Sequence, residues 1–334
     1  MKGYRCLTAH DASQWREATE GALAESFDLA WLQSHAPDVH RICLDLHGAA
    51  RARCSLWWTQ TPAYGTERVG LIGHFAALDE PAARYLLADA CAQLAGRGCT
   101  LAIGPMDGNT WRRYRFVSER RSAPPFFLEP DNPDAWPRYF EAAGFARLAH
   151  YSSALTDDLS ARDPRIARAA DRWTERGIRV RPFEPERFEQ ELAAIYALSA
   201  ISFRRNFLYT PIAEAEFIAQ YRQVRSCMRP ELTLLAETGE RLVGFLFALP
   251  DVLQAARGEP VDTVIVKTVA VLPDRQCAGL GGWMVGRVQE IAHELGYRRA
   301  IHALMHDENR SRNISDRYAR PMRGYTLYAR RLAP

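Results

Sequence analysis

The chain has 334 residues, of which 47% are apolar and 25% charged, and its net charge is +3. This composition is typical of globular proteins and excludes global disorder, and the length predicts two domains of about 150 residues each. The longest apolar run, residues 242–249, has less than half the roughly 20 residues of a membrane-spanning helix, and the weak net charge does not favour nucleic-acid binding.

In the first half, we expect strands over residues 3–9, 41–46, 51–59, 68–78, 100–103 and 148–155, and helices over 12–24, 81–94 and 134–143. Two prolines in sequence at 124–125 indicate a loop over residues 118–131. A polar stretch over residues 156–164 indicates the boundary between the halves.

In the second half, a linking helix over 165–176 precedes strands over 178–183, 231–237, 241–249, 263–272, 299–305 and 325–332, with helices over 185–201, 211–224 and 282–295. The two halves share an order of elements without sharing sequence, which indicates a duplicated pattern. The sequence therefore predicts an α/β protein in which each half is a mixed sheet flanked by helices, with domains at 1–157 and 178–334 joined by a linker helix at 158–177.

The cysteines indicate the redox compartment. Seven occur, at positions 6, 43, 54, 91, 99, 227 and 277, and no CxxC pair is present. An odd, scattered set favours reduced thiols over a disulfide framework. The N-terminal segment has no apolar core followed by a cleavage site, so we expect no secretory signal and a cytoplasmic location.

One segment has the pattern of a phosphate-binding loop. In residues 264–282, VIVKTVAVLPDRQCAGLGG, an apolar strand ends at Pro273 and a glycine-containing loop leads into a helix. Successive N–H groups of such a loop, together with the helix N-terminus, can bind a pyrophosphate without a cationic side chain. The segment lacks both the Walker and the GxGxxG patterns. An ordinary glycine-rich turn remains the alternative.

The loop resembles a known motif. Gln276-Cys277-Ala278-Gly279-Leu280-Gly281 fits the Q/R-x-x-G-x-G/A pattern of the GNAT superfamily of acyl-CoA-dependent N-acyltransferases. The resemblance covers roughly residues 178–334 and implies acetyl-CoA as co-substrate. It places the pantetheine arm on the backbone of Val269 and Val271 and assigns the remaining cofactor contacts to Gln276, Cys277, Ala278, Gly279, Leu280, Gly281, Gly282 and Asn309.

The chemistry implied by the resemblance is attack of a neutral amine on a thioester, which needs an oxyanion donor and an acid for the leaving thiolate. The superfamily often uses a tyrosine as this acid, and Tyr318 is the best candidate. It follows Asn309 by nine residues instead of seven, so Tyr325 and Tyr328 remain alternatives. A packed tyrosine without a catalytic role is equally compatible with the sequence.

Three further residue groups need an interpretation. Lys267 is unusual in so apolar a strand, and we expect it either to hold a substrate carboxylate, to point into an open cleft or to snorkel. His302 and His306, on one face of a predicted strand, lack a third spaced ligand, so we expect no metal site. Cys277 lies at a helix N-terminus, yet we expect no catalytic role. The pair Trp57-Trp58 and residues 111–114 could line a substrate cleft, although core packing is the stronger expectation.

The first half looks like a degenerate copy. Residues 132–145, NPDAWPRYFEAAGF, match the Asn…Tyr-x-x-x-Gly-Phe ending of the superfamily. The strand at 68–78 is followed by Asp79, Glu80 and Pro81, with two carboxylates and no glycine where a pyrophosphate would lie. The sequence therefore predicts one CoA site per chain.

The leading prediction is an N-acetyltransferase acting on a small-molecule or protein amine, with no nucleic-acid or membrane partner and no metal. A Fem-type aminoacyl transferase, which takes aminoacyl-tRNA as donor, is one alternative, and the intact loop and weak charge disfavour it. A non-catalytic CoA-binding scaffold or sensor is another. A homodimer is compatible with the sequence, and the acceptor remains open among polyamines, amino acids, aminoglycosides and proteins.

Overall fold

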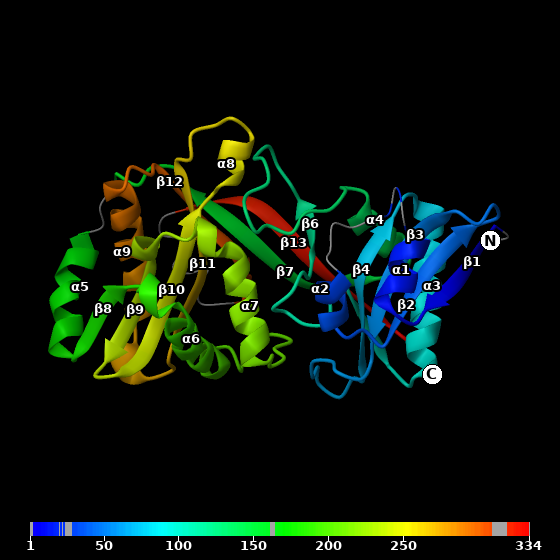
Figure 1. Ribbon diagram of the computed structural model, residues 1–334, viewed down its shortest axis with the longest axis horizontal. Helices are drawn as coiled ribbons and strands as arrows, with labels where there is room; N and C mark the ends of the chain where they lie inside the picture. The colour runs from blue at the N-terminus through cyan, green and yellow to red at the C-terminus, as the bar shows by residue number, and fades with distance from the viewer. Residues whose placement is uncertain are drawn as a thin grey trace.

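A computed structural model of the chain describes residues 3–19, 21, 23, 29–160, 164–308 and 319–333. In this part of the chain, 13 strands form one continuous mixed sheet that helices cover on both faces (Figure 1). The predicted α/β class is therefore confirmed.

The first half follows the predicted order. Its strands are β1 (Tyr4–Ala9), β2 (Val39–Asp45), β3 (Ala50–Trp57), β4 (Val69–Ala77), β5 (Leu101–Gly104), β6 (Phe116–Glu119) and β7 (Ala146–Thr156), and its helices are α1 (Ala12–Ala18), α2 (Leu29–Ser34), α3 (Glu80–Gly96) and α4 (Trp136–Ala142). α1 ends earlier than predicted, because the Thr19 hydroxyl bonds to the carbonyl oxygen of Trp15 at 2.8 Å and caps the last turn. α2 and β6 were not predicted, because both are too short to show a periodic pattern.

The second half also matches closely. Its strands are β8 (Ile178–Pro182), β9 (Thr233–Thr238), β10 (Arg241–Pro250), β11 (Thr263–Val271), β12 (Arg299–His306) and β13 (Arg320–Arg331), its α-helices are α5 (Pro164–Glu175), α6 (Phe188–Ser202), α7 (Glu214–Val224), α8 (Leu253–Ala256) and α9 (Leu280–Glu294), and 3₁₀ turns lie at Pro185–Arg187, Arg225–Cys227, Pro230–Leu232 and Arg275–Cys277. The short α8 was not predicted.

The two halves exchange strands. The sheet order is β1-β2-β3-β4-β5-β13-β7-β12-β11-β10-β9-β8, so β13, from the end of the chain, pairs with β5 and β7 of the first half, and β7 pairs with β12 of the second. Figure 1 shows β7 in green and β13 in red between the two lobes, with the C-terminus in the lobe that holds the N-terminus. The predicted domain boundaries at residues 157 and 178 therefore remain a prediction from the sequence. In space, residues 320–331 complete the sheet of the first half.

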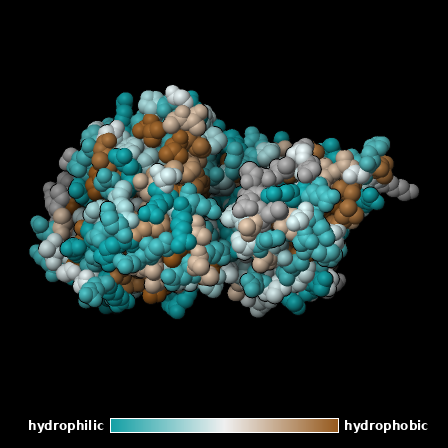
Figure 2. All heavy atoms as spheres, viewed as in Figure 1, coloured by the Kyte–Doolittle hydropathy of each residue, from teal (hydrophilic) through white to brown (hydrophobic). Residues whose placement is uncertain are grey.

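Each half has its own apolar core. In the first half, α3 packs on β2, β3 and β4, and in the second half α6 and α9 both pack on β10 and β11. Polar residues cover most of the face in Figure 2, and apolar ones gather over the part of the molecule that holds α8. Among the described helices, none combines the length and the apolar character needed to cross a bilayer.

The parallel pair in the first half is closed. β4 pairs with β5 only over Val69–Leu71. Beyond this point the segment that follows β5 bonds to β4, since the amide of Met106 donates to the carbonyl oxygen of Ile72 at 2.9 Å. The contact is close at Gly73, where a Cβ atom would lie 2.2 Å from the carbonyl oxygen of Met106. The space between the two strands is therefore filled by backbone.

We expect Gly73→Ala to lower the free energy of unfolding by about 2–3 kcal/mol, because the added methyl must push backbone aside instead of a flexible side chain. Gly96→Ala is the matched control, since a Cβ there meets nothing within 4 Å. Urea unfolding of both variants measures the difference. Equal stabilities would show that the segment at Met106 yields easily and is not a fixed part of the fold.

Candidate functional site

In the second half, the corresponding parallel pair opens. β11 pairs with β12 only over Thr263–Val266. β12 departs at a bulge, where its register to β7 shifts between His302 and Met305 and Leu304 has a φ of 61°. The rest of β11 therefore has no backbone pairing to β12 in the described chain.

The backbone of this unpaired part of β11 is available on one side. The amide of Leu272 donates to the carbonyl oxygen of Val243, a residue of β10, at 2.8 Å. Because amides alternate in direction along a strand, those of Val271 and Val269 point away from β10 and toward the opening. Ser202, at the end of α6, donates to the carbonyl oxygen of Val271 at 3.2 Å. Val269 and Val271, the predicted pantetheine contacts, thus lie at the opened edge.

The predicted pyrophosphate loop forms a turn and then a helix start. The amide of Gln276 bonds to the Asp274 carboxylate at 2.9 Å, and those of Cys277 and Ala278 bond within the turn. Gly279 has a φ of 92° and is the N-cap of α9. The next amides, over residues 280–282, belong to the first helical turn, where no preceding carbonyl is in reach. The donors suited to an anion therefore lie over residues 279–282, at the helix N-terminus.

The linking helix α5 adds positive charge at this loop. Arg176 donates to the carbonyl oxygen of Gln276 at 2.8 Å, and Arg172 donates to that of Ala278 at 3.5 Å. The Trp283 indole of α9 bonds to the carbonyl oxygen of Ile166 at 2.9 Å and holds α5 in place. The sequence analysis missed these arginines, whose spacing of four residues was the available signal.

Cys277 is a buried residue of this turn, with 5% of its surface exposed. Burial raises the pKa of its thiol, and the carboxylate of Asp274 adds to the shift while Arg241 and Arg176 oppose it. The thiol is therefore a poor nucleophile, which agrees with the expectation of no catalytic role.

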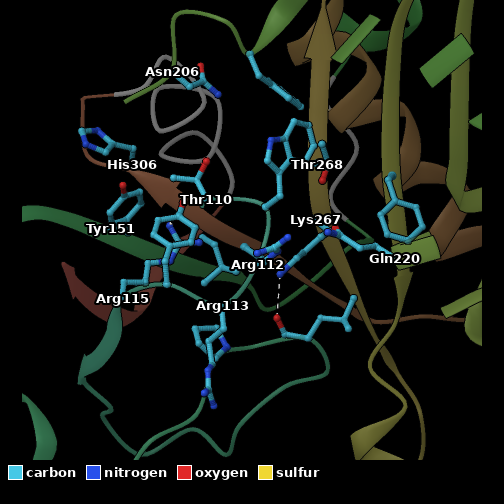
Figure 3. Close-up of a pocket in the computed structure, with 18 of the residues that line it drawn as sticks. Thr110, Arg112, Arg113, Arg115, Tyr151, Asn206, Gln220, Lys267, Thr268 and His306 are labelled. Carbon is cyan, nitrogen blue, oxygen red and sulfur yellow. Dashed lines mark hydrogen bonds between the residues drawn. The ribbon is translucent and has the colours of Figure 1, made fainter. Parts of the chain in front are cut away.

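A large cavity lies beside the opened strands. Its volume is about 1300 Å³, and both halves contribute to its wall. Val266, Lys267, Thr268 and Val269 of β11 form one side, and the segment 110–115 of the first half approaches from another (Figure 3). Trp111 and Tyr114 line the cavity, as expected if residues 111–114 form part of a substrate cleft. Trp57 is instead buried in a hydrophobic core. Further aromatic residues on the wall are Trp31, Tyr151, Phe203, Phe207, Tyr209, Tyr221 and Phe247.

Lys267 lies in this wall. Its ammonium donates to the carbonyl oxygen of Leu128 at 2.9 Å, the dashed line in Figure 3. Burial lowers the pKa of Lys267 to about 7, the charge of Arg115 lowers it further, and Glu129 opposes the shift. Near neutral pH the side chain is therefore divided between its charged and neutral forms.

The tyrosine candidates fall in different places. Tyr318 and Asn309 lie outside the described residues. Tyr325 is buried and donates to Glu129 at 2.5 Å, and Tyr328 lies in the first-half core and donates to Glu141 at 3.0 Å. Neither of the last two lines the large cavity. Tyr151 of β7 does line it, and sequence reasoning missed it because β7 precedes the predicted domain.

The expectation that His302 and His306 share a strand face is wrong. The two residues pair with Ala154 and Tyr151 of β7, three positions apart, so the bulge turns their side chains to opposite faces. His302 accepts a hydrogen bond from Gln289 at 2.7 Å, and burial lowers its pKa to about 4. His306 lines the cavity, with its ring edge-on to Tyr151 at 4.8 Å between centroids.

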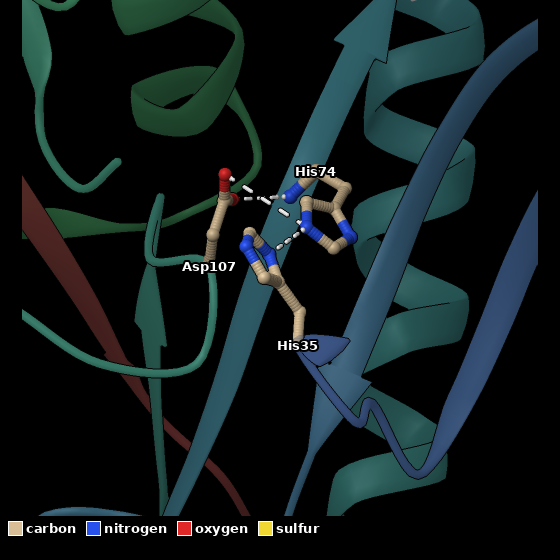
Figure 4. A group of neighbouring side chains, drawn as sticks. All are labelled: His35, His74 and Asp107. Carbon is tan, nitrogen blue, oxygen red and sulfur yellow. Dashed lines mark hydrogen bonds and ion pairs between the residues drawn. The ribbon is translucent and has the colours of Figure 1, made fainter. Parts of the chain in front are cut away.

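Three buried residues of the first half, His35, His74 and Asp107, are of types that bind metals, and their ligand atoms lie within 4.8 Å of one another (Figure 4). Sequence reasoning missed the group because its members are far apart in the chain. Each member has a protein partner. His35 bonds to His74 at 2.8 Å, and Asp107 accepts the His74 amide at 2.6 Å and the Arg113 guanidinium at 3.2 Å. Burial, then His74 and Arg112, lower the pKa of His35 to about 2. The positive charges of the neighbouring Arg112 and Arg113 disfavour a cation here, so we assign the group to filling the gap beside β4.

Lys267 also predicts a pH dependence of stability. The folded pKa of about 7 lies below the ordinary value of 10.5, so between these values the unfolded chain binds a proton that the folded chain lacks. The contribution of Lys267 to the free energy of unfolding therefore increases as the pH rises from about 7 to 10.5. We expect Lys267→Met to be more stable than the wild type near pH 7, with the advantage shrinking toward pH 10.

Urea unfolding at pH 7 and pH 9.5 measures this difference. Lys267→Arg is the control, because arginine stays charged throughout and should give no stabilisation at pH 7. If the free energies of unfolding of Lys267→Met and the wild type differed by the same amount at both pH values, Lys267 would not have a lowered pKa in the folded chain.

Comparison with known proteins identifies the family. Residues 192–314 match the sequence model of the acetyltransferase (GNAT) family. The chain is also similar to a bacterial ceramide synthase from Caulobacter vibrioides, with 28% identity over 194 residues that cover 55% of this chain and 49% of that protein. The chain thus spans about half the length of the curated relative it matches.

Solved structures share the fold. A GCN5-related N-acetyltransferase from Sphaerobacter thermophilus has a TM-score of 0.50 at 13% identity, with 99% of this chain and 96% of that chain covered. A protein from Enterococcus faecalis described as a probable N-acyltransferase has a TM-score of 0.56 at 10% identity, with 98% and 73% covered. Residues 192–314 therefore match the acetyltransferase (GNAT) family, in a chain that has the fold of GCN5-related N-acetyltransferases over nearly its whole length.

Proposed function

We propose that the protein is an acyl-CoA-dependent N-acyltransferase, with acetyl-CoA as the simplest donor and an amine as acceptor. One observation carries this proposal. The opened edge of β11, with the amides of Val269 and Val271 directed into the opening, runs from the helix N-terminus at Gly279 to the large cavity. A diphosphate at the helix start and a thioester at the cavity fit the two ends of this edge.

Acyl-CoA would supply an activated carbonyl at the cavity. The chain holds the donor through the amides of Val269 and Val271, and one of these donors also suits the oxyanion that forms when the amine attacks. Arg172 and Arg176 add positive charge where the phosphates would lie. We keep Tyr318 as the proposed acid for the thiolate, because Tyr325 and Tyr328 do not line the cavity and their hydroxyls already donate to Glu129 and Glu141.

The cavity and the relative together favour an acceptor or acyl group with an apolar chain. A cavity of about 1300 Å³ with an aromatic wall is larger than an acetyl group and a small amine require. The similar protein from Caulobacter vibrioides is named a ceramide synthase, and such an enzyme handles long apolar chains. We therefore propose a long-chain amine or acyl group ahead of the smaller acceptors.

Several related expectations stay proposals. All seven cysteines are free thiols, which supports a reducing, cytoplasmic environment. We propose no nucleic-acid partner, and a homodimer remains compatible with the chain. A Fem-type donor is disfavoured by the CoA-type loop. A scaffold or sensor would bind CoA without releasing free thiol from acetyl-CoA in the presence of amines, so thiol release decides between it and an enzyme.

Gly281→Glu should abolish measurable CoA binding, because its side chain brings bulk and negative charge to the helix N-terminus. Gly281 is a cleaner position than Gly279, where a φ of 92° would strain any side chain. Gly281→Ala is the matched control, since its Cβ would meet Val269 at an ordinary 3.4 Å. Calorimetry with CoA compares the two. Unchanged affinity in folded Gly281→Glu would overturn the loop assignment.

Tyr318→Phe should lower turnover by about 10²–10³-fold and leave CoA affinity nearly unchanged, because the phenol is needed only when the thiolate leaves. Release of free thiol from acetyl-CoA, followed with a chromogenic disulfide, measures the rate. A wild-type rate would remove Tyr318 from the mechanism and leave Tyr151 or water as the acid.

A further inference from the structure

Among the described residues, the wall of the large cavity holds five arginine or lysine side chains against three acids, Glu129, Glu216 and the exposed Glu308. Two of its arginines are already used by acids, since Arg112 pairs with Glu216 at 2.8 Å and Arg113 pairs with Asp107 at 3.2 Å. Arg115 has no such partner. Within the described ranges, no carboxylate lies within 4.0 Å of its guanidinium, although the residue has only 6% of its surface exposed.

Aromatic rings, not acids, surround the Arg115 guanidinium. Its central carbon lies 4.0 Å from the centre of the Tyr114 ring and 4.2 Å from that of Tyr151. One terminal nitrogen donates to the Tyr114 hydroxyl at 2.7 Å, whereas Nε is buried without a hydrogen-bond partner. Cation–π contacts offset part of the cost of burying this charge, but they leave N–H donors unused.

A second unused donor lies on the other side of Tyr151. The His306 ring accepts the amide of Glu308 at Nδ1 at 3.1 Å, so the neutral ring carries its proton on Nε2. This Nε2 is buried without a partner. Figure 3 shows His306, Tyr151 and Arg115 in succession along one side of the cavity, with Lys267 across from them in this view. Burial lowers the pKa of His306, the neighbouring acids Glu308 and Asp307 oppose this shift, and the charge of Arg115 adds to it.

Glu129, the acid whose charge acts on the pKa of Lys267, already has partners. Glu129 is buried and bonds to Arg323 at 2.8 Å and to Tyr325 at 2.5 Å. Its single negative charge is therefore matched by Arg323, and the charges of Arg115 and Lys267 remain uncompensated in the same interior. Repulsion between them lowers the pKa of Lys267, as described above. Uncompensated buried cations with unused donors are the features of an anion site.

We propose that Arg115, His306 and Lys267 form a subsite of the cavity that binds an anionic group, a carboxylate or a phosphate, carried by the amine acceptor. The anion would accept hydrogen bonds from the unused donors and compensate the two cations. The assignment to the acceptor rests on the proposed acyl transfer, whereas the anion subsite itself does not. The substrate class it implies is an amine with an anionic group, such as an amino acid or a phosphorylated amino lipid.

Binding of octyl phosphate and octanol tests the subsite without any need for turnover. The two probes share an alkyl chain and differ in the anionic group. By calorimetry at low ionic strength, where charge interactions are least screened, we expect octyl phosphate to bind at least 10-fold more tightly than octanol. Equal binding, or no binding of octyl phosphate, would overturn the subsite.

Variants locate the site. Arg115→Met and Lys267→Met should each weaken octyl phosphate at least 10-fold while leaving octanol unchanged. Arg205→Met is the control, because Arg205 also lines the cavity but is exposed to solvent, and it should change the affinity less than 2-fold. Wild-type affinity in folded Arg115→Met would contradict the proposal. If that variant does not fold, Lys267→Met decides by the same criterion.

A third measurement finds which substrate carries the anion. With acetyl-CoA present at saturation, octyl phosphate should bind as it does with succinyl-CoA present. If succinyl-CoA weakens octyl phosphate at least 10-fold, the subsite holds the carboxylate of the acyl group, and the assignment to the acceptor is wrong. A separate titration of the protein with acetyl-CoA measures the CoA affinity, so a failure of the proposed function is seen separately from a failure of the anion subsite.

Discussion

Strands β7 and β13 hold the two halves in one sheet, because β13 pairs with β5 and β7, and β7 also pairs with β12. Without these two strands the sheet would divide between the halves. The exchange also fixes the position of the cavity, since Tyr151 of β7 faces His306 of β12. A hydrogen bond beside the cavity also joins the two halves. Trp111 of the first half bonds to the carbonyl oxygen of Thr210 at 2.8 Å. Both halves thus contribute to the cavity wall, whereas the opened edge of β11 belongs to the second half alone.

The space between the two parallel strands is open in the second half and filled in the first. Between β11 and β12 the backbone is open and the following helix begins at a glycine. Between β4 and β5 the space is filled, and the carboxylate of Asp107 occupies the amide of His74. α3 is capped by Asp79, whose carboxylate accepts the amide of Ala82 at 2.9 Å and pairs with Arg51 at 2.6 Å. A carboxylate of the chain therefore stands where a bound phosphate would lie in the other half.

Periodicity and turn residues predicted nearly every long element, and the glycine-containing segment around Gly279 predicted the turn and the helix start there, because both signals are local in the chain. The features that were missed depend on distant segments. The unpaired state of Arg115 follows from rings at 114 and 151, and the bulge at Leu304 reversed the expected face of His306. The strand exchange has no local signal, since β13 has the same alternating pattern whichever strand it pairs with.

The central claim is that one fold occurs twice and only the second copy retains a donor site. Calorimetric titration of the full chain with acetyl-CoA or CoA tests it most directly through the stoichiometry. The account predicts one site per chain, lost in Gly281→Glu. Two equivalent sites would contradict it, because the backbone at Met106 and the carboxylates of Asp79 and Asp107 would then have to leave the gap beside β4.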